Sequence, residues 1–176
     1  DGEHRVRIRL PLVDGGDDGI WARVASLDAG DDRGFFFRPE IGDEVVVGFL
    51  DDHPRHGVIL GMLHSSAKAA PPQGSDDNHE KLYKSRSGLR LQFNDDKKVM
   101  TLDTPAGNSI ILSEDDKSIV LADQNGNKIT MNSDGIKIES AKATEIKAGT
   151  EAKLESGTSF SAKGGSGVEL DGGSEA

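Results

Sequence analysis

Closely spaced histidines and paired aspartates are the residues of this chain whose types could support chemistry. His53 and His56 flank a predicted turn, but two imidazoles without a cysteine or a carboxylate at fixed geometry make a weak metal site. The pairs Asp95-Asp96 and Asp115-Asp116 share only their residue type with the acid pair of a glycosidase, because adjacent residues on an exposed turn cannot flank a glycosidic bond. We interpret all of them as turn residues.

A third set of candidate ligands is formed by Asp96, Asp115 and Asp134, which recur every 19 residues. Calcium-binding solenoids place their aspartates in a shorter Gly-Gly-x-Gly-x-Asp repeat, so the longer spacing favours turn capping over calcium binding. The sequence has no phosphate-binding loop, no Gly-x-Ser-x-Gly motif and no Ser-His-Asp order. It therefore predicts no catalytic residue, no cofactor and no metal ion, and a protein that is not an enzyme.

An eight-residue repeat occupies the C-terminal residues. From Ile136 the octads read IKIESAKA, TEIKAGTE, AKLESGTS, FSAKGGSG and VELDGGSE. Eight is not a helical period, and the apolar pair two residues apart in each octad indicates a short strand. The small residues at positions five and six are suited to a corner. A short fixed period of this kind is typical of a β-solenoid.

The octads also bear on the number of chains. Burying one apolar side chain is worth about 1.5–3 kcal/mol, whereas ordering the backbone of one residue costs about 1–2 kcal/mol. Two modest apolar side chains per octad cannot offset that cost in a single chain. We therefore expect an obligate oligomer, most simply a homotrimer that forms a triangular β-prism. The predicted trimer core consists of Ile136, Ile138, Ile146, Leu154, Phe160, Ala162, Val168 and Leu170.

The composition narrows the possible partners. Only 34% of the 176 residues are hydrophobic, the net charge is −10, and there is no cysteine. The acidic balance makes nucleic acid an improbable partner, and no apolar run approaches membrane-spanning length. The chain begins at Asp1 without an initiator methionine or a signal peptide, so we expect it to be part of a longer protein.

Four zones follow one another along the chain. Residues 1–64 contain five predicted short strands, as in a small closed barrel of the OB type; these strands are 4–10, 21–24, 34–37, 43–50 and 57–63. Residues 65–86 are polar, include Pro71-Pro72, and read as a linker.

Residues 87–135 carry a 19-residue repeat, and residues 136–176 carry the octads. Gly88, Gly107 and Gly126 mark three repeats, each of which predicts a strand, a turn and a second strand. We expect the solenoid to begin near Ser87. The predicted fold class is all-β, with an OB-fold barrel followed by a trimeric intertwined β-helix, or β-prism, that forms a needle.

The chain resembles the spikes of contractile injection machines: VgrG of type VI secretion, the central spike of contractile phage tails, and related extracellular injection particles. The N-terminal match comprises Arg5-Val6 through Pro11, Trp21 to Val24 and the run PEIGDEVVVGF at 39–49. The segment 125–129 is similar to the family's entry into its β-helix. The chain departs from the family at Leu12, where members often have tryptophan, and at the short linker, where some phage spikes insert a lysozyme domain.

The resemblance implies a membrane-puncturing role that is mechanical rather than catalytic. It also implies several partners: a PAAR-type tip protein near Val168 and Leu170, hub or baseplate and inner-tube proteins, effector cargo, and a target membrane that is crossed mechanically. The implied location is the bacterial cytoplasm during assembly on the injection machine, followed by ejection. Because no histidine follows His79, we do not expect the histidine-bound metal that some phage needle tips hold.

Two other functions remain open on the sequence. One is an OB-fold ligand-binding module displayed on a trimeric β-fibre stalk, with Trp21 and Phe35–Phe37 as stacking groups. The acidic charge opposes a nucleic-acid ligand, and we expect those aromatic residues to fill the barrel core instead. The other is a cell-wall hydrolase, for which the sequence offers no plausible catalytic pair.

Overall fold

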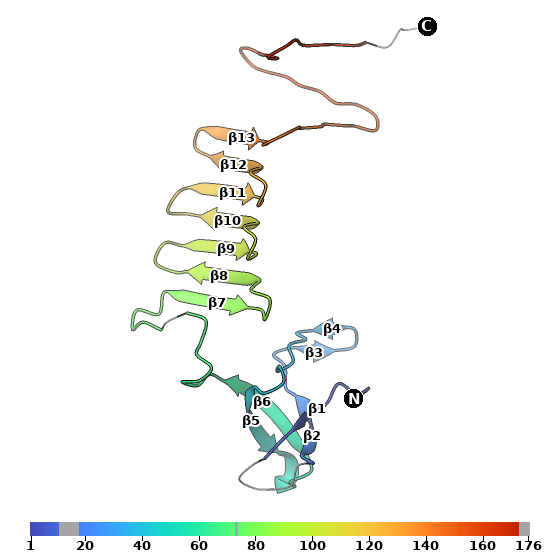
Figure 1. The fold of residues 1–176 in the computed structure, drawn as a ribbon, viewed down its shortest axis with the longest axis vertical. Helices are drawn as coiled ribbons and strands as arrows, with labels where there is room; N and C mark the ends of the chain where they lie inside the picture. Colours follow the sequence, from blue (N-terminus) through green and yellow to red (C-terminus); the bar gives the residue numbers. More distant parts are fainter. Residues whose placement is uncertain (11–17, 73, 173–176) are drawn as a thin grey trace.

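A four-stranded and a seven-stranded β-sheet follow one another along an elongated molecule (Figure 1). The computed structural model describes residues 1–10, 18–72 and 74–172. Pro11 and Leu12, which figure in the family resemblance, and residues 173–176 of the octad zone lie outside the described residues. Among the described residues, no helix has the length and apolar character needed to span a bilayer.

The N-terminal sheet has four strands in the order β1-β2-β6-β5. β2 and β6 run parallel, and the other two pairings are antiparallel. Alternation along HRVRIRL and IWARV places Ile8 and Ala22 on the inner face, where they are buried together with Ile59. The strand bounds are β1 Val6–Ile8, β2 Ile20–Val24, β5 Glu44–Phe49 and β6 Gly57–Leu63, and a 3-10 turn η1 Leu50–Asp52 follows β5.

The prediction of a strand at 34–37 is wrong beyond its first residue. Only Arg33–Gly34 (β4) pairs, in a small hairpin with Ala29–Gly30 (β3). Phe35–Phe37 are exposed, and Trp21 is 46% exposed because it lies on the opposite face of β2 from Ala22. The expectation that these aromatic residues fill a barrel core is therefore wrong, because aliphatic residues and an alanine fill it.

The prediction that the whole of 65–86 is a linker is wrong for its last residues. Glu80–Lys84 forms strand β7, which pairs antiparallel with β8 and brings Tyr83 opposite Leu91. Strand β8 supplies the backbone hydrogen-bonding partners that make Glu80–Lys84 a strand. The local composition of these residues gives no information about that pairing.

The second sheet is a seven-stranded antiparallel meander in which every strand pairs with its sequence neighbour. Each 19-residue repeat contributes two strands, and Gly88, Gly107 and Gly126 lie at positive φ in the turns between repeats. Within one chain this zone is a single-layered meander, and the solenoid formed by three intertwined chains stays a prediction. The remaining strands are β8 Arg90–Asn94, β9 Val99–Asp103, β10 Ser109–Ser113, β11 Ser118–Ala122, β12 Lys128–Asn132 and β13 Gly135–Glu139.

The octads form a strand only at their start. β13 contains Ile136 and Ile138, whereas residues 140–172 have no strand and run back and forth as extended chain beyond the sheet (Figure 1). The prediction of short strands throughout the octads therefore does not hold within one chain. An extended segment needs a neighbouring strand for its backbone hydrogen bonds, and a single copy offers none to these described residues.

The turns at the other edge of the sheet contain two lysines in a left-handed conformation, Lys98 (φ 52°) and Lys117 (φ 49°). A residue with a Cβ loses about 1–2 kcal/mol in this region, and glycine does not. We expect Lys117→Gly to raise the free energy of unfolding by about 1 kcal/mol, measured by thermal denaturation. The control is Lys97→Gly, which we expect to lower it by about 0.5–1 kcal/mol. Equal destabilisation by both variants would contradict the assigned turn conformation.

Candidate interface: the apolar face of the seven-stranded sheet

Two columns of apolar side chains run the length of the seven-stranded sheet. Every strand from β8 to β13 contributes one residue to each column, and the two residues are two positions apart, so both columns lie on the same face. The strand register gives Tyr83, Leu91, Leu102, Ile110, Leu121, Ile129 and Ile138 in the first column, and Phe93, Met100, Leu112, Ile119, Met131 and Ile136 in the second.

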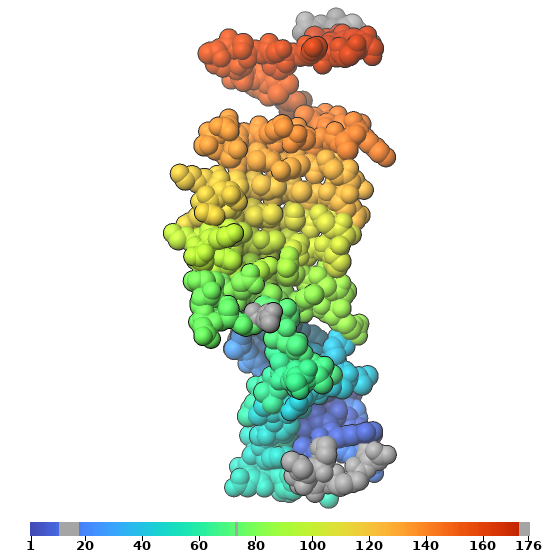
Figure 2. All heavy atoms as spheres, turned by 60° about the vertical axis from the view of Figure 1, so that its left-hand side comes forward, coloured from blue at the N-terminus to red at the C-terminus, as the bar shows by residue number. Residues whose placement is uncertain are grey.

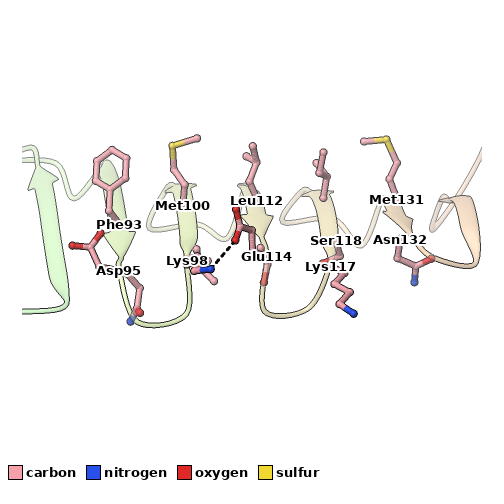
Figure 3. Close-up of a pocket in the computed structure, with 14 residues that line it drawn as sticks. Phe93, Asp95, Lys98, Met100, Leu112, Glu114, Lys117, Ser118, Met131 and Asn132 are labelled. Atoms are coloured by element: carbon pink, nitrogen blue, oxygen red, sulfur yellow. Dashed lines mark ion pairs between the residues drawn. The ribbon is translucent and has the colours of Figure 1, made fainter.

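Nothing within the described chain covers this face. Figure 3 shows Phe93, Met100, Leu112 and Met131 projecting to the same side of the sheet. Five column residues in the middle of the sheet are 38–42% exposed, among them Leu102 at 42% and Leu121 at 38%, and exposure rises to 72% at Ile136. The other mid-sheet members of the columns are half-buried. A contiguous apolar surface of this extent marks an interaction site in a soluble protein.

The total surface leads to the same conclusion. The chain exposes 15005 Å² at a mass of 18.7 kDa, whereas a compact monomer of that mass exposes roughly 8300 Å². Figure 2 shows why the exposed surface is large: successive stretches of the chain are stacked along one long axis, and the segment that follows the seven-stranded sheet extends away from it. One copy is therefore an incomplete folding unit that requires further chains.

The columns continue into the first octad. Ile136 pairs with Met131 and Ile138 pairs with Ile129, so octad positions one and three extend the second and first columns respectively. The other predicted core residues follow in the extended segment at the same two octad positions, and most are largely exposed in one chain, for example Ile146 at 81% and Leu154 at 80%. The remaining members are Phe160, Ala162, Val168 and Leu170.

The opposite face of the sheet is mixed and carries ion pairs. The guanidinium group of Arg90 hydrogen-bonds both carboxylate oxygens of Asp103 across β8 and β9, and this contact raises the pKa of Arg90 and lowers that of Asp103. A second ion pair lies at the sheet edge beside the second column, where Lys98 and Glu114 of successive turns meet with 3.3 Å between Nζ and Oε2 (Figure 3). The central column on this face contains Gln92, Thr101, Ile111, Val120, Thr130 and Lys137.

The candidate metal ligands do not come together. The rings of His53 and His56 stack with their centroids 4.5 Å apart. Within the described part of the chain, no group of three histidine or acidic side chains could hold a metal ion. Asp96, Asp115 and Asp134 lie in separate turns at the sheet edge, as turn residues should.

A junction between the two sheets was missed by the sequence reasoning. The ring of Phe37 packs against that of Tyr83 with 5.0 Å between centroids, and Arg86 forms an ion pair of 2.8 Å with Glu40. Tyr83 is also the first residue of an apolar column. The GFFFRP segment therefore ties the N-terminal domain to the base of the apolar face, although no local period in the sequence signals this contact.

The fold and the uncovered apolar face of the second sheet define the class of protein. It is an all-β protein whose second half has a surface suited to packing against further copies. Residues 1–64 match the type VI secretion system/phage-baseplate injector OB domain, and residues 99–175 match the phage baseplate V C-terminal trimerisation domain. The chain belongs to the VgrG and contractile phage tail spike family. The trimerisation match supports a homotrimer.

Several relatives are type VI secretion system spike proteins of Pseudomonas aeruginosa. The chain is 32% identical to VgrG1c over 78 residues, which make up 43% of this chain and 11% of VgrG1c. It is 32% identical to VgrG1a over 78 residues, or 43% of this chain and 12% of VgrG1a. It is also 32% identical to VgrG4b over 88 residues, or 49% of this chain and 11% of VgrG4b. The matched segments thus span about a tenth of the length of these relatives.

Two adjacent residues of β12 test the assignment of the faces. Ile129 belongs to an apolar column and Thr130 to the opposite face. We expect Ile129→Asp to abolish trimer formation, because its three carboxylates would lie in an apolar interior at a cost of several kcal/mol each. Thr130→Asp introduces the same side chain one position away, and we expect it to leave the trimer intact. Light scattering coupled to size exclusion reads both masses, and equal behaviour of the two variants would refute the assignment.

Proposed function

We propose that this chain forms the membrane-puncturing spike of a contractile injection system, as a homotrimer that acts mechanically rather than by catalysis. The observation that carries the proposal is the uncovered apolar face, whose two columns run through the sheet and into the octads. Three copies that turn this face toward a common axis bury it completely and form a closed triangular prism.

The orientation of the strands suits axial force. In Figure 1 the strands of the second sheet lie across the long axis of the molecule, so their hydrogen bonds run along that axis. Successive strands lie about 4.8 Å apart, and each is paired on both sides between β7 and β13. A push along the axis therefore compresses a continuous hydrogen-bond ladder that is supported from inside by a packed apolar core.

The octad zone completes the needle in this proposal. Residues 140–172 lack hydrogen-bonding partners for a strand within one chain, and three such segments wound around the axis supply them for one another. Octad positions one and three then face the axis. The core residues from Ile146 to Leu170 thereby extend the two columns of the sheet.

The proposed partners follow from this arrangement. The last octad ends in open strand edges and an apolar core, which a PAAR-type tip protein would cover at Val168 and Leu170. The N-terminal domain would join hub or baseplate and inner-tube proteins, and effector cargo would travel with the spike. The assembly would form in the bacterial cytoplasm and then be ejected across a target membrane. The net charge of −10 opposes a role in binding nucleic acid.

A ligand-binding OB module on a β-fibre stalk is the second candidate function. The exposure of Trp21 and Phe35–Phe37 favours it, because these rings are accessible for stacking on a ligand. However, Phe37 packs on Tyr83, and the guanidinium group of Arg38 lies 5.8 Å from the ring centroid of Phe36. The rings of Phe36 and Phe37 are therefore engaged by other residues of the chain, and the contact of Phe37 joins the two sheets, which favours the spike.

Ile146 tests the octad core. We expect Ile146→Asp to lower the thermal midpoint of the trimer sharply, because three carboxylates near one axis each cost several kcal/mol to desolvate. The matched control is Lys147→Asp at octad position four, which faces outward in the proposed needle and should leave the midpoint nearly unchanged. A heat-stable Ile146→Asp trimer would show that the third octad position does not face the axis.

The tip assignment is tested by truncation. A spike that ends at Gly157 retains the second sheet and loses Val168 and Leu170. We expect the truncated trimer to lose capture of the cognate cone-shaped tip protein in a pull-down, while the full chain retains it. Light scattering on the truncated protein confirms that it is still a trimer. Undiminished capture by that trimer would place the tip-binding surface elsewhere.

A further inference from the structure

Three turns of the same shape are stacked along one edge of the seven-stranded sheet. They span residues 85–89, 104–108 and 123–127, on the right-hand edge of the sheet in Figure 1. In each turn the first N–H donates to the fifth carbonyl, and the fourth N–H donates to the first carbonyl. The fourth residue is always a glycine at positive φ. Equivalent positions in the three turns can therefore be compared directly.

The fifth residue of a turn reaches the turn that follows it. Asn108 Oδ1 accepts a hydrogen bond of 3.2 Å from the backbone N–H of Gln124, which is the second residue of the next turn. Asn127 Oδ1 accepts one of 3.0 Å from the backbone N–H of Ala141 and another of 3.1 Å from Ser140 Oγ. Ser140 and Ala141 form the small corner of the first octad. Each asparagine thus bridges two successive levels of the stack.

The other end of each asparagine side chain is fixed within its own turn. Asn108 Nδ2 donates to Thr104 Oγ1 at 3.1 Å, and Asn127 Nδ2 donates to Asp123 Oδ2 at 2.7 Å. Hydrogen bonds from the backbone and side chain of Asn127, with further ones from Asn125, lower the pKa of Asp123 to about 2. The acceptor is therefore ionised at neutral pH, and its bond to Asn127 is charge-assisted.

The first turn is the exception, and its chemistry explains why. Its fifth residue is Leu89, and the residue above it, equivalent to Gln124, is Pro105. Proline has no backbone N–H, so no acceptor is required at this level. Pro105 instead packs over Gly88, where an added Cβ would lie 2.8 Å from Pro105 Cγ. An asparagine acceptor is thus present in the two turns that lie below a backbone N–H, that of Gln124 or of Ala141. The turn that lies below Pro105 has a leucine instead.

We propose that Asn108 and Asn127 are register-setting residues that hold each turn over the next, and that Asn127 seats the first octad on the sheet. By holding the corner 140–141 above the turn 123–127, Asn127 directs the chain so that the apolar columns continue from Ile138 toward Ile146. This role is exerted within each chain and does not depend on the proposed puncturing function. The transition from the sheet to the octads therefore depends on one specific side chain, that of Asn127.

The natural Leu-Pro pair supplies the first test, a double-mutant cycle on the full chain. We expect Asn108→Leu to lower the thermal midpoint by about 3 °C, because it leaves the N–H of Gln124 without an acceptor. Gln124→Pro alone should also be harmful, because it removes the donor to Asn108. The combination Asn108→Leu with Gln124→Pro reproduces the pair Leu89 and Pro105, and we expect it to recover much of the loss. Strictly additive effects would overturn the proposed pairing.

Amide hydrogen exchange gives a second, residue-resolved test. We expect Asn127→Leu to speed exchange of the Ala141 amide by about tenfold and to leave the Gln124 amide unchanged. Asn108→Leu should do the reverse, which makes each variant the control for the other. General destabilisation would instead speed exchange at both amides in both variants, and that outcome would refute a register-setting role. Unchanged exchange of Ala141 in Asn127→Leu would refute the seating of the octad.

Discussion

The seven-stranded sheet is a single layer, and its apolar face has nothing within the chain to pack against. A sheet with one apolar face is stable in water only when a second layer covers that face. Among the described residues, neither a helix nor a second sheet does so, and the only buried hydrophobic residues are Ile8, Ala22 and Ile59 of the N-terminal domain. The stability of the second half therefore has to come from other copies.

This constraint accounts for features that otherwise look unrelated. In the proposed trimer, apolar residues recur two apart in every strand from β8 to β13 because both columns face the axis, and the Arg90–Asp103 ion pair lies on the outer face. In the proposed trimer, the octads are extended because their hydrogen-bonding partners lie in the other two chains. The contact of Phe37 with Tyr83 joins the N-terminal domain to the base of the first column.

The sequence predicted those parts of the fold that have a local period. The 19-residue repeat anticipated β8 to β13, and the octads anticipated that Ile136 and Ile138 would share a face. It failed where a distant contact decides the conformation. Phe35–Phe37 have high strand propensity, but they lie at the junction between the two sheets. The residues of β7 have the composition of a linker and form a strand because they pair with β8. The asparagine bridges were also missed, because they depend on which turns are stacked.

The central claim is that three copies bury the apolar face, and the mass of the chain in solution tests it most directly. Native mass spectrometry or sedimentation equilibrium on the purified full chain, diluted toward nanomolar concentration, measures that mass without any substitution. The account predicts a concentration-independent particle of three times the chain mass of 18.7 kDa. A folded particle of a single chain mass, with the second sheet intact, would contradict it.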